Sequence, residues 1–451
     1  MDSTPVSEPQ VLDNSAEPPL ATGGFTPADI RRNMKTVILL NSLFATGWAE
    51  LFLALSPLWI YLGASNTTIG LINAASMTGL FGMFISPWIS KLFPVKKWYL
   101  LVAHLPYLLP LGLAGLGVIF SGRIALFSPA LLVHVHILNH DFTGSRLLLF
   151  VVGMLVVHNF FGGFVSLPHQ EYIAACIPMS HRGRYTGLSG SFSAAVAWGA
   201  TAVGGVLLLK VPQPICYGFL MIMTWAICQS GYVVALFAKE KPVPRTGTPY
   251  PWSREMLGAA WNNKLFVRTM IARALGQLTF LPAAGFILYY GLRDLKMIPA
   301  TVALGAIFKQ IARILTSAPS GWVIDRQGAK NIWALAPLGS VIVYAAVLVI
   351  PGSYGVYIAG VLATALVTST WAAGDVLLYG LPRPEHRPGY YTIQSIMDTV
   401  MVAFGGVLMG KMYDLIPYRT GFAIMLVVSL LAFPVMKWLL HPLSADARAY
   451  S

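Results

Sequence analysis

Residues 321–330 read Gly-Trp-Val-Ile-Asp-Arg-Gln-Gly-Ala-Lys, a polar and basic stretch between two long apolar runs. Two helices separated by so few polar residues must form a tight hairpin, and Gly328 supplies the backbone freedom for its turn. Asp325, beside Arg326 and Lys330, can hold ion pairs at the edge of a membrane. The stretch therefore predicts a short loop between two membrane-spanning helices.

The composition excludes a soluble globular protein. Of the 451 residues, 56% are hydrophobic and only 10% are charged, whereas a soluble domain carries about 25% charged residues. The mean hydropathy is +0.67. The net charge of +13 would favour a nucleic-acid partner in a soluble protein. In an apolar chain it reflects basic loops instead, so we expect a polytopic protein of the lipid bilayer with no nucleic-acid partner.

Apolar runs of about 20 residues are long enough to cross a membrane as helices. They predict six spans on each side of a polar segment at 239–264, which we interpret as a cytoplasmic linker between two bundles, 35–238 and 265–441. The first six are expected at 35–62, 68–93, 98–120, 147–177, 185–209 and 215–238. The second six are expected at 265–292, 298–324, 332–350, 354–379, 390–415 and 421–440. Residues 1–34 are expected to be a disordered cytoplasmic tail, and 442–451 a second tail.

The order G-x-x-x-D-R-x-G-x-K, formed by Gly321, Asp325, Arg326, Gly328 and Lys330, resembles the loop signature of the major facilitator superfamily between helices 8 and 9. The resemblance implies an all-α polytopic membrane protein with 12 transmembrane helices in two six-helix bundles. It also implies a monomeric secondary transporter that moves a small-molecule substrate by alternating access, in a bacterial-type inner membrane.

The first half carries a weaker copy of this stretch in residues 86–97. Ser90 stands where the Asp would be and Phe93 where the Gly would be, although several lysines keep the basic character. Most of the 30 Lys and Arg residues fall on the side of these two loops. Basic loops stay inside, so this side, with both termini, is predicted to be cytoplasmic.

An acid followed by a His-Arg pair occurs at corresponding places in the two halves. Glu171 precedes the pair that ends at Arg182, and Asp375 precedes the pair that ends at Arg387. Such recurrence is expected of repeated bundles. These residues lie near the cytoplasmic ends of their helices, which favours gate ion pairs over substrate contacts. The predicted gating residues are Asp325, Arg326, Gly328, Lys330, Glu171, Arg182, Asp375 and Arg387.

Ionisable side chains inside the membrane are functional candidates, because their burial is costly unless they face a cavity or a partner. Lys309 and Arg313 lie four residues apart and therefore share one helix face. With Arg273 in the preceding helix they leave the second half electropositive, which favours an anionic substrate. We predict that these three cations bind the substrate, together with Trp371, which lies within a span.

Glu50 lies about halfway through the first span, where a carboxyl group suits the uptake and release of a proton. Asp398 is the clear interior acid of the second half. His158 is an intramembrane histidine that can relay protons or serve as hydrogen-bonded structure. The three are candidates for proton coupling. The alternative is a structural network in which Asp398 pairs with Arg313, and Glu50 reaches Lys309 across the two bundles.

The outer segment 123–146 contains an apolar stretch, 124–138, too short for a span, which predicts a loop with an interfacial helix. His134, His136, His140 and Asp141 in this loop could bind a transition metal, or could be an ordinary exposed polar cluster. The three cysteines show neither metal-ligand nor disulfide spacing. We predict no metal site and no cofactor.

Together these features predict a proton-coupled carrier of a small organic anion. An efflux antiporter for lipophilic or cationic compounds is the alternative, in which Glu50 and Asp398 bind the drug and the proton alternately. A non-transporting membrane receptor or a membrane-embedded enzyme is an alternative of another class. The spans contain no nucleophile-and-base constellation and no nucleotide-binding loop, so we expect neither catalysis nor ATP hydrolysis.

Overall fold

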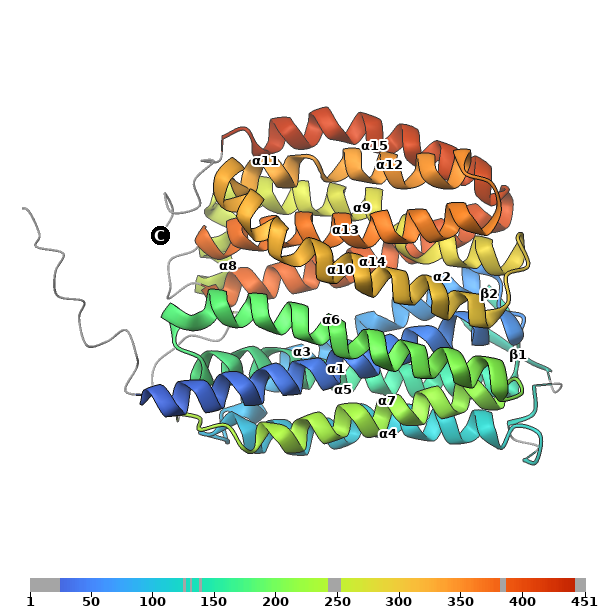
Figure 1. The fold of residues 1–451 in the computed structure, drawn as a ribbon, viewed down its shortest axis with the longest axis horizontal. Coiled ribbons are helices and arrows are strands. Elements are labelled where there is room, and N and C mark those ends of the chain that lie inside the picture. The colour runs from blue at the N-terminus through green and yellow to red at the C-terminus, as the bar shows by residue number, and fades with distance from the viewer. Residues whose placement is uncertain are drawn as a thin grey trace, which may run out of the picture.

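The computed structural model describes residues 25–124, 127–129, 132–137, 140–241, 253–381 and 387–442. Within them the chain forms two bundles of long helices that run side by side (Figure 1). The first bundle consists of α1 (Pro27–Tyr61), α2 (Asn66–Ala74), the 3₁₀ turn η1 (Ala75–Met77), α3 (Thr78–Ser90), α4 (Lys96–Ile119), α5 (Arg146–Cys176), α6 (Met179–Lys210) and α7 (Ile215–Ala235). The second consists of α8 (Arg254–Asn262), α9 (Lys264–Arg293), α10 (Pro299–Gln327), α11 (Ala329–Ala334), α12 (Ala336–Val349), α13 (Gly352–Gly380), α14 (Arg387–Leu415) and α15 (Tyr418–Leu440).

The predicted architecture of twelve spans in two bundles is confirmed. In the described part, 11 helical segments are long and apolar enough to cross a membrane; one runs through α2, η1 and α3, and another through α11 and α12. The twelfth is α10, which is 29 residues long. Lys309 and Arg313 lower its hydropathy, so its length and its place in the bundle identify it as a span.

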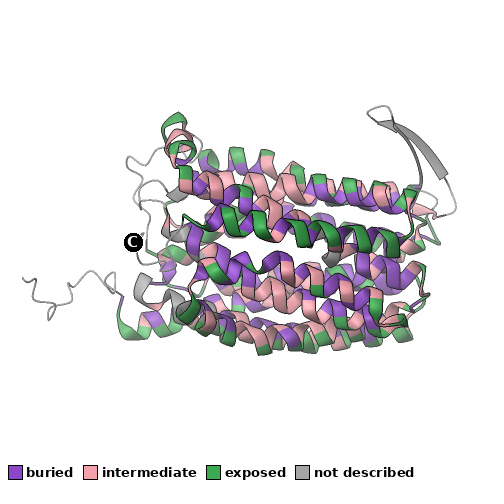
Figure 2. Cartoon of the chain, turned by 90° about the horizontal axis from the view of Figure 1, so that it is seen from above, coloured by how far each residue is buried: buried purple, intermediate pink, exposed green. Residues whose placement is uncertain are grey.

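The outer faces of the bundles are apolar, as contact with lipid requires. On α4, for example, the exposed residues recur at helical spacing along one face: Val102, Leu105, Leu109, Leu113 and Leu116. Figure 2 shows the corresponding alternation of exposed outer and buried inner positions along the helices. The interior of each bundle is therefore separated from lipid by its own helices.

Two helix pairs make the most extensive contacts between the bundles. α6 packs against α10 along the middle of the molecule (Figure 1), and α2 packs against α14. The second seam is tight, because a Cβ atom on Gly70 would lie 2.8 Å from the carbonyl carbon of Gly406. The two seams hold the bundles together.

The two ends of the molecule differ. At one end, here called the basic end, α10 turns into α11 at Gly328, which has a φ of 81° and so adopts the left-handed region that favours glycine. The start of α1 and the end of α15 lie at the same end. The opposite end carries the α1–α2 connection and two short strands (Figure 1). The loop predicted from residues 321–330 is thus a tight helical hairpin.

The interfacial helix predicted at 124–138 is wrong. Strand β1 (Leu132–Ile137) pairs antiparallel with β2 (His140–Ser145), with Val133 opposite Gly144. Apolar β-branched residues alternate with histidines along β1, and this period of two favours a strand over a helix. The side chains of His134, His136, His140 and Asp141 lie outside the described residues.

Two further boundaries differ from the prediction. α1 begins at Pro27 rather than at residue 35, because Thr26 and Asp29 form a capping box with two hydrogen bonds of 3.1 Å, and Pro27 suits the first turn. The polar segment 239–264 contains the short helix α8 (Arg254–Asn262). Residues 242–252 and 1–24 of the predicted linker and tail lie outside the described residues.

Candidate functional site

The second bundle brings three of the predicted charges into one ionic cluster. Arg273 on α9 donates from Nε and Nη2 to the two carboxylate oxygens of Asp398 on α14, over 2.8 and 2.9 Å. Its Nη1 donates to Asp375 Oδ1 on α13 over 3.1 Å. The Arg273 side chain is only 8% exposed, against 35% for Asp375 and 26% for Asp398. Because a planar guanidinium suits such bidentate contacts, Arg273 is fully engaged by two acids.

This pairing differs from the structural network considered from the sequence. Asp398 binds Arg273 on the neighbouring helix α9 and not Arg313. Glu50 does not bind Lys309, since neither carboxylate oxygen of Glu50 has a hydrogen-bond partner among the residues that the structure describes. Among the described residues, Lys309 and Arg313 form no hydrogen bond or ion pair through their charged groups. Two cations of the second bundle are therefore available to a ligand.

Lys309 lies against α13. A Cβ atom on Gly360 would be 2.7 Å from Lys309 Cε, so this glycine makes room for the lysine stem. Gly360, Trp371 and Asp375 fall on one stripe of α13 by the 3.6-residue period. Arg273 contacts the other end of this stripe: its guanidinium lies 5.7 Å from the centre of the Trp371 ring. Lys309 and Arg273 therefore contact the same face of α13 at different heights.

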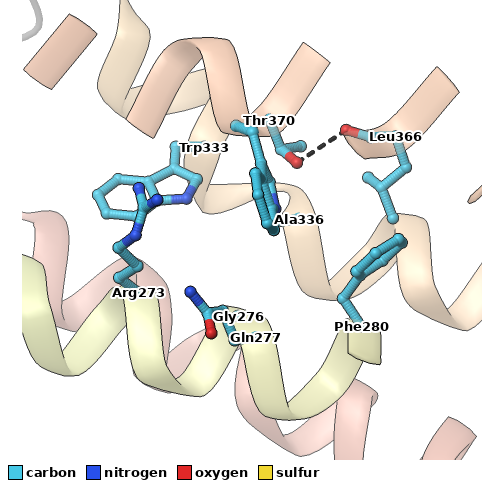
Figure 3. Close-up of a pocket in the computed structure, with 9 residues that line it drawn as sticks. Arg273, Gly276, Gln277, Phe280, Trp333, Ala336, Leu366 and Thr370 are labelled. Atoms are coloured by element: carbon cyan, nitrogen blue, oxygen red, sulfur yellow. Dashed lines mark hydrogen bonds between the residues drawn. The ribbon is translucent and has the colours of Figure 1, made fainter. Parts of the chain in front are cut away.

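A cavity of about 20 Å³ lies beside the ionic cluster, which is room for about one water molecule. Figure 3 shows Arg273 and Gln277 projecting from α9 toward the tryptophan and aliphatic side chains of the facing helices. The lining residues are Arg273, Gly276, Gln277, Phe280, Trp333, Ala336, Leu366, Thr370 and Trp371. The lining combines aromatic walls with a few polar groups, but the cavity is too small in this state for an organic ligand.

Sequence reasoning placed Trp371 here but missed Gln277, Phe280 and Trp333. Gln277 is 3% exposed; its Nε2 donates to Asp398 Oδ1, and its Oε1 has no partner in the described part of the chain. Its spacing of four residues from Arg273 could have identified it, because both then share one face of α9. No comparable signal existed for Trp333, which reaches the cavity only through packing.

Glu50 is fully buried in the first bundle. Its carboxyl group sits against α6, where a Cβ atom on Gly204 would lie 3.1 Å from Glu50 Cδ and would overlap the carboxylate oxygen Oε2. Within the described part of the chain, both oxygens lack hydrogen-bond partners. An ionised carboxylate in such a place is costly, so this geometry suits the neutral acid.

His158 lies in an aromatic cluster of the first bundle. Its Nδ1 is 2.7 Å from the carbonyl oxygen of Tyr107, and its ring stacks on the Tyr107 ring at a centroid distance of 4.4 Å. Trp48 packs against it with centroids 5.8 Å apart. The other ring nitrogen has no partner within the described residues. The contacts favour a packed, hydrogen-bonded histidine over a member of the second-bundle site.

The predicted gating residues form several separate contacts at the basic end. Glu171 pairs with Lys96 over 3.1 Å within the first bundle. Arg326 lies 3.9 Å from the centre of the Trp322 ring, and Lys330 Nζ donates to the carbonyl oxygen of His441 over 3.3 Å. Asp375 belongs to the Arg273 cluster instead. The side chains of Asp325, Arg182 and Arg387 lie outside the described residues.

Glu240 supplies the acid that the weak first-half loop lacks. It accepts hydrogen bonds from the backbone N–H groups of Lys96 and Lys97 at the start of α4, the latter over 2.8 Å. Burial raises the pKa of the Glu240 carboxyl, against the opposing effect of these N–H groups. A carboxylate at a helix N-terminus is stabilising. Glu240, which follows α7 in the chain, therefore holds the α3–α4 turn in place.

We expect Glu240→Gln to lower the free energy of unfolding by about 1 kcal/mol, the typical contribution of a helix cap. Thermal denaturation of the purified protein measures the change. Glu255→Gln removes the same charge at an exposed position of α8 and is the matched control. Equal melting temperatures for the two variants would contradict the capping role.

A network that the sequence did not reveal joins the bundles at the opposite end. Asp414 at the end of α14 accepts from the backbone N–H groups of Asn66 and Thr67, over 3.0 and 2.8 Å, and so caps the start of α2. Arg293 at the end of α9 donates to Asn66 Oδ1 over 2.8 Å, and Tyr418 donates to the same oxygen. We call this group of Asn66, Thr67, Arg293, Asp414 and Tyr418 the latch. It closes the opposite end of the molecule.

The fold matches solved structures over almost its whole length. The xylose transporter XylE from E. coli, in a partially occluded inward open conformation, matches with a TM-score of 0.66 at 14% identity, covering 91% of this chain and 97% of that one. The nucleoside transporter NupG matches with a TM-score of 0.63 at 12% identity, covering 90% and 98%. A bacterial homologue of the iron transporter ferroportin in an outward-facing state matches with a TM-score of 0.58 at 14% identity, covering 91% and 99%. A comparison with curated protein sequences gives no match.

The sequence pattern of the Major Facilitator Superfamily matches residues 279–449. This part of the chain is therefore similar in sequence to that superfamily. The match begins inside α9 and covers the rest of the second bundle, which contains the G-x-x-x-D-R-x-G-x-K stretch. The first half, where Ser90 and Phe93 depart from the loop pattern, lies outside the matched residues and resembles the solved transporters in fold alone.

Proposed function

We propose that the protein is a secondary active transporter that carries a small organic anion, coupled to protons, by alternating access. The observation that carries the proposal is the pair of unpartnered cations, Lys309 and Arg313, on one face of α10 inside the membrane. A buried charge without a partner is costly. A bound anion would offset that cost, whereas a neutral solute would leave it.

The surroundings of the two cations support an anion site. Thr364 lies one turn after Gly360 on the face of α13 that Lys309 contacts; its hydroxyl donates to the carbonyl oxygen of Gly360 over 2.9 Å and can still accept a hydrogen bond. Trp371 lies further along this face and can pack against an organic group. In the proposal Lys309 and Arg313 hold the anionic group and Trp371 its apolar part. Arg273, predicted as a third anion ligand, instead positions Asp375 and Asp398.

Glu50 is the proposed proton carrier. It is a fully buried acid of the first bundle. Because its oxygens have no partner among the described residues, it can exchange a proton when the space between the two bundles opens to water. Asp398 is a second candidate, released whenever Arg273 moves. The proposal further places the protein as a monomer in a cell inner membrane. The basic end and both termini are then cytoplasmic, in accordance with the distribution of Lys and Arg.

A second candidate is an efflux antiporter for lipophilic cations. The observation in its favour is the ionic cluster itself, where two carboxylates face a single guanidinium beside a cavity with aromatic walls. A cationic compound could replace Arg273 at Asp398 and stack on the rings. The two candidates differ in the sign of the ligand charge.

A thermal-stability screen distinguishes them, because a ligand that binds only the folded state raises the melting temperature. The panel contains small organic anions, lipophilic cations, sugars and nucleosides; the last two are included because solved structures of this fold are named as carriers of them. We expect stabilisation by anions that Lys309→Ala abolishes and Lys411→Ala, at an exposed position of the same bundle, leaves unchanged. Stabilisation by lipophilic cations alone, lost in Asp398→Asn, would replace the proposal by efflux.

A further inference from the structure

Glu50 lies next to the α6–α10 seam between the two bundles. Its carboxyl group packs on Gly204 of α6, while a Cβ atom on the next residue, Gly205, would lie 2.9 Å from Cβ of Ala303 on α10. The residue that Glu50 contacts, Gly204, is thus the neighbour of a residue that contacts the second bundle. A change in the position or charge of Glu50 would act on α6 where α6 meets α10.

The place that Glu50 occupies is a slot shaped by glycine. A Cβ atom on Gly204 would overlap the carboxyl oxygen of Glu50 and would lie 2.7 Å from Leu53 Cδ2. The slot is therefore full, and no other residue at 204 leaves room for the carboxyl group. Gly199 on the same helix has open space around it, so the close packing at Gly204 and Gly205 is not a property of α6 as a whole.

The slot offers no compensation for a charge. Charged or titratable interior side chains on the helices packed against α1 include His158 on α5, Arg273 on α9, and Lys309 and Arg313 on α10. None of them forms a hydrogen bond or an ion pair with Glu50 within the described residues. An ionised Glu50 must therefore leave the slot or draw a cation or water into it.

We infer that Gly204 is a positioning residue for proton coupling: it holds the protonated Glu50 against α6, and loss of the proton drives the carboxyl group out of the slot and loosens the α6–α10 seam. The inference rests on the proton coupling proposed above and adds the means by which the proton acts on the two bundles. It assigns the regulated contact to Gly205 and Ala303, immediately beside the slot.

Spin labels on α6 and α10 test the inference without knowledge of the substrate. Labels at Lys210→Cys and Ile298→Cys lie at exposed positions near the neighbouring ends of the two helices, while the native cysteines, Cys176, Cys216 and Cys228, are buried. The distance between the labels is measured by double electron–electron resonance in nanodiscs below and above neutral pH. We expect one short distance at acidic pH and an added longer population at alkaline pH.

Four variants in this background give the decisive comparison. Glu50→Gln is expected to keep the short distance at both pH values. Gly204→Ala is expected to show the longer population at both, because its methyl group expels the carboxyl group. Glu50→Asp/Gly204→Ala shortens the acid by one methylene and is expected to restore the pH response. Gly199→Ala should behave as the parent protein does.

The outcomes distinguish the role of Glu50 as proton carrier from the role of Gly204 as its positioning residue. A pH response in Glu50→Gln equal to that of the parent would overturn Glu50 as the proton carrier, and with it this inference, and would leave Asp398 as the candidate for proton coupling. A response lost in Glu50→Gln but unchanged in Gly204→Ala would overturn the role of Gly204 alone. If Gly204→Ala does not fold, the double variant decides: a folded double variant without a pH response also overturns it.

Discussion

Replacing Arg273 by glutamine is expected to destabilise the protein strongly, because it leaves Asp375 and Asp398 facing each other without a cation. Breaking a buried ion pair from one side typically costs about 3–5 kcal/mol. The two carboxylates here are 35% and 26% exposed, so we expect a loss near the lower end, about 3 kcal/mol. Thermal denaturation in detergent measures it.

The charge state of the cluster provides the control. Arg273→Gln/Asp398→Asn removes one positive and one negative charge and should recover part of the lost stability, since only Asp375 then remains unpaired. Arg273→Lys should be intermediate, because it keeps the charge but not the bidentate geometry. Lys264→Gln, at the exposed start of α9, should have little effect. If the double variant is no more stable than Arg273→Gln, the cluster is not held together by charge.

Replacing Asp414 by asparagine is expected to open the end of the molecule that carries the latch. The carboxylate accepts two backbone hydrogen bonds from α2 across the seam between the bundles. Its side chain is exposed, so we assign the pair about 1–2 kcal/mol, which shifts an equilibrium by a factor of roughly 5–30. The closed state should lose population by that factor, because the latch forms only when α2 meets α14.

Cysteine accessibility measures this shift. Val407 lies in the α2–α14 seam beside Gly70, and Val407→Cys should react with a membrane-impermeant maleimide faster when Asp414→Asn is also present. Asp294→Asn makes the same charge change at an exposed position of the same end, and leaves the hydrogen bonds to α2 intact. Equal labelling rates in the Asp414→Asn and Asp294→Asn backgrounds would show that the latch does not hold the seam closed.

Local signals in the sequence were sufficient for the architecture. Apolar runs predicted the spans, and the glycine in residues 321–330 predicted the turn between α10 and α11. They failed at two places. A short apolar stretch in which every second residue is apolar forms the strand β1 and not a helix. A capping box places the start of α1 at Pro27. In both cases hydropathy alone predicted the element, whereas the alternation of residues in β1 and the capping residues of α1 decided it.

The sequence by itself determined the class of protein, the helices and the identity of every charge inside the membrane, because hydropathy and helical period depend on neighbours along the chain. Only the tertiary structure decided which charges meet. Arg273 finds Asp398 at a separation of 125 residues, and Asn66 finds Asp414 at a separation of 348. Such contacts depend on how each helix is rotated and which helices pack together, and these are set by the packing of both bundles at once. The same packing seats Glu50 on Gly204 and leaves Lys309 and Arg313 without a partner among the described residues.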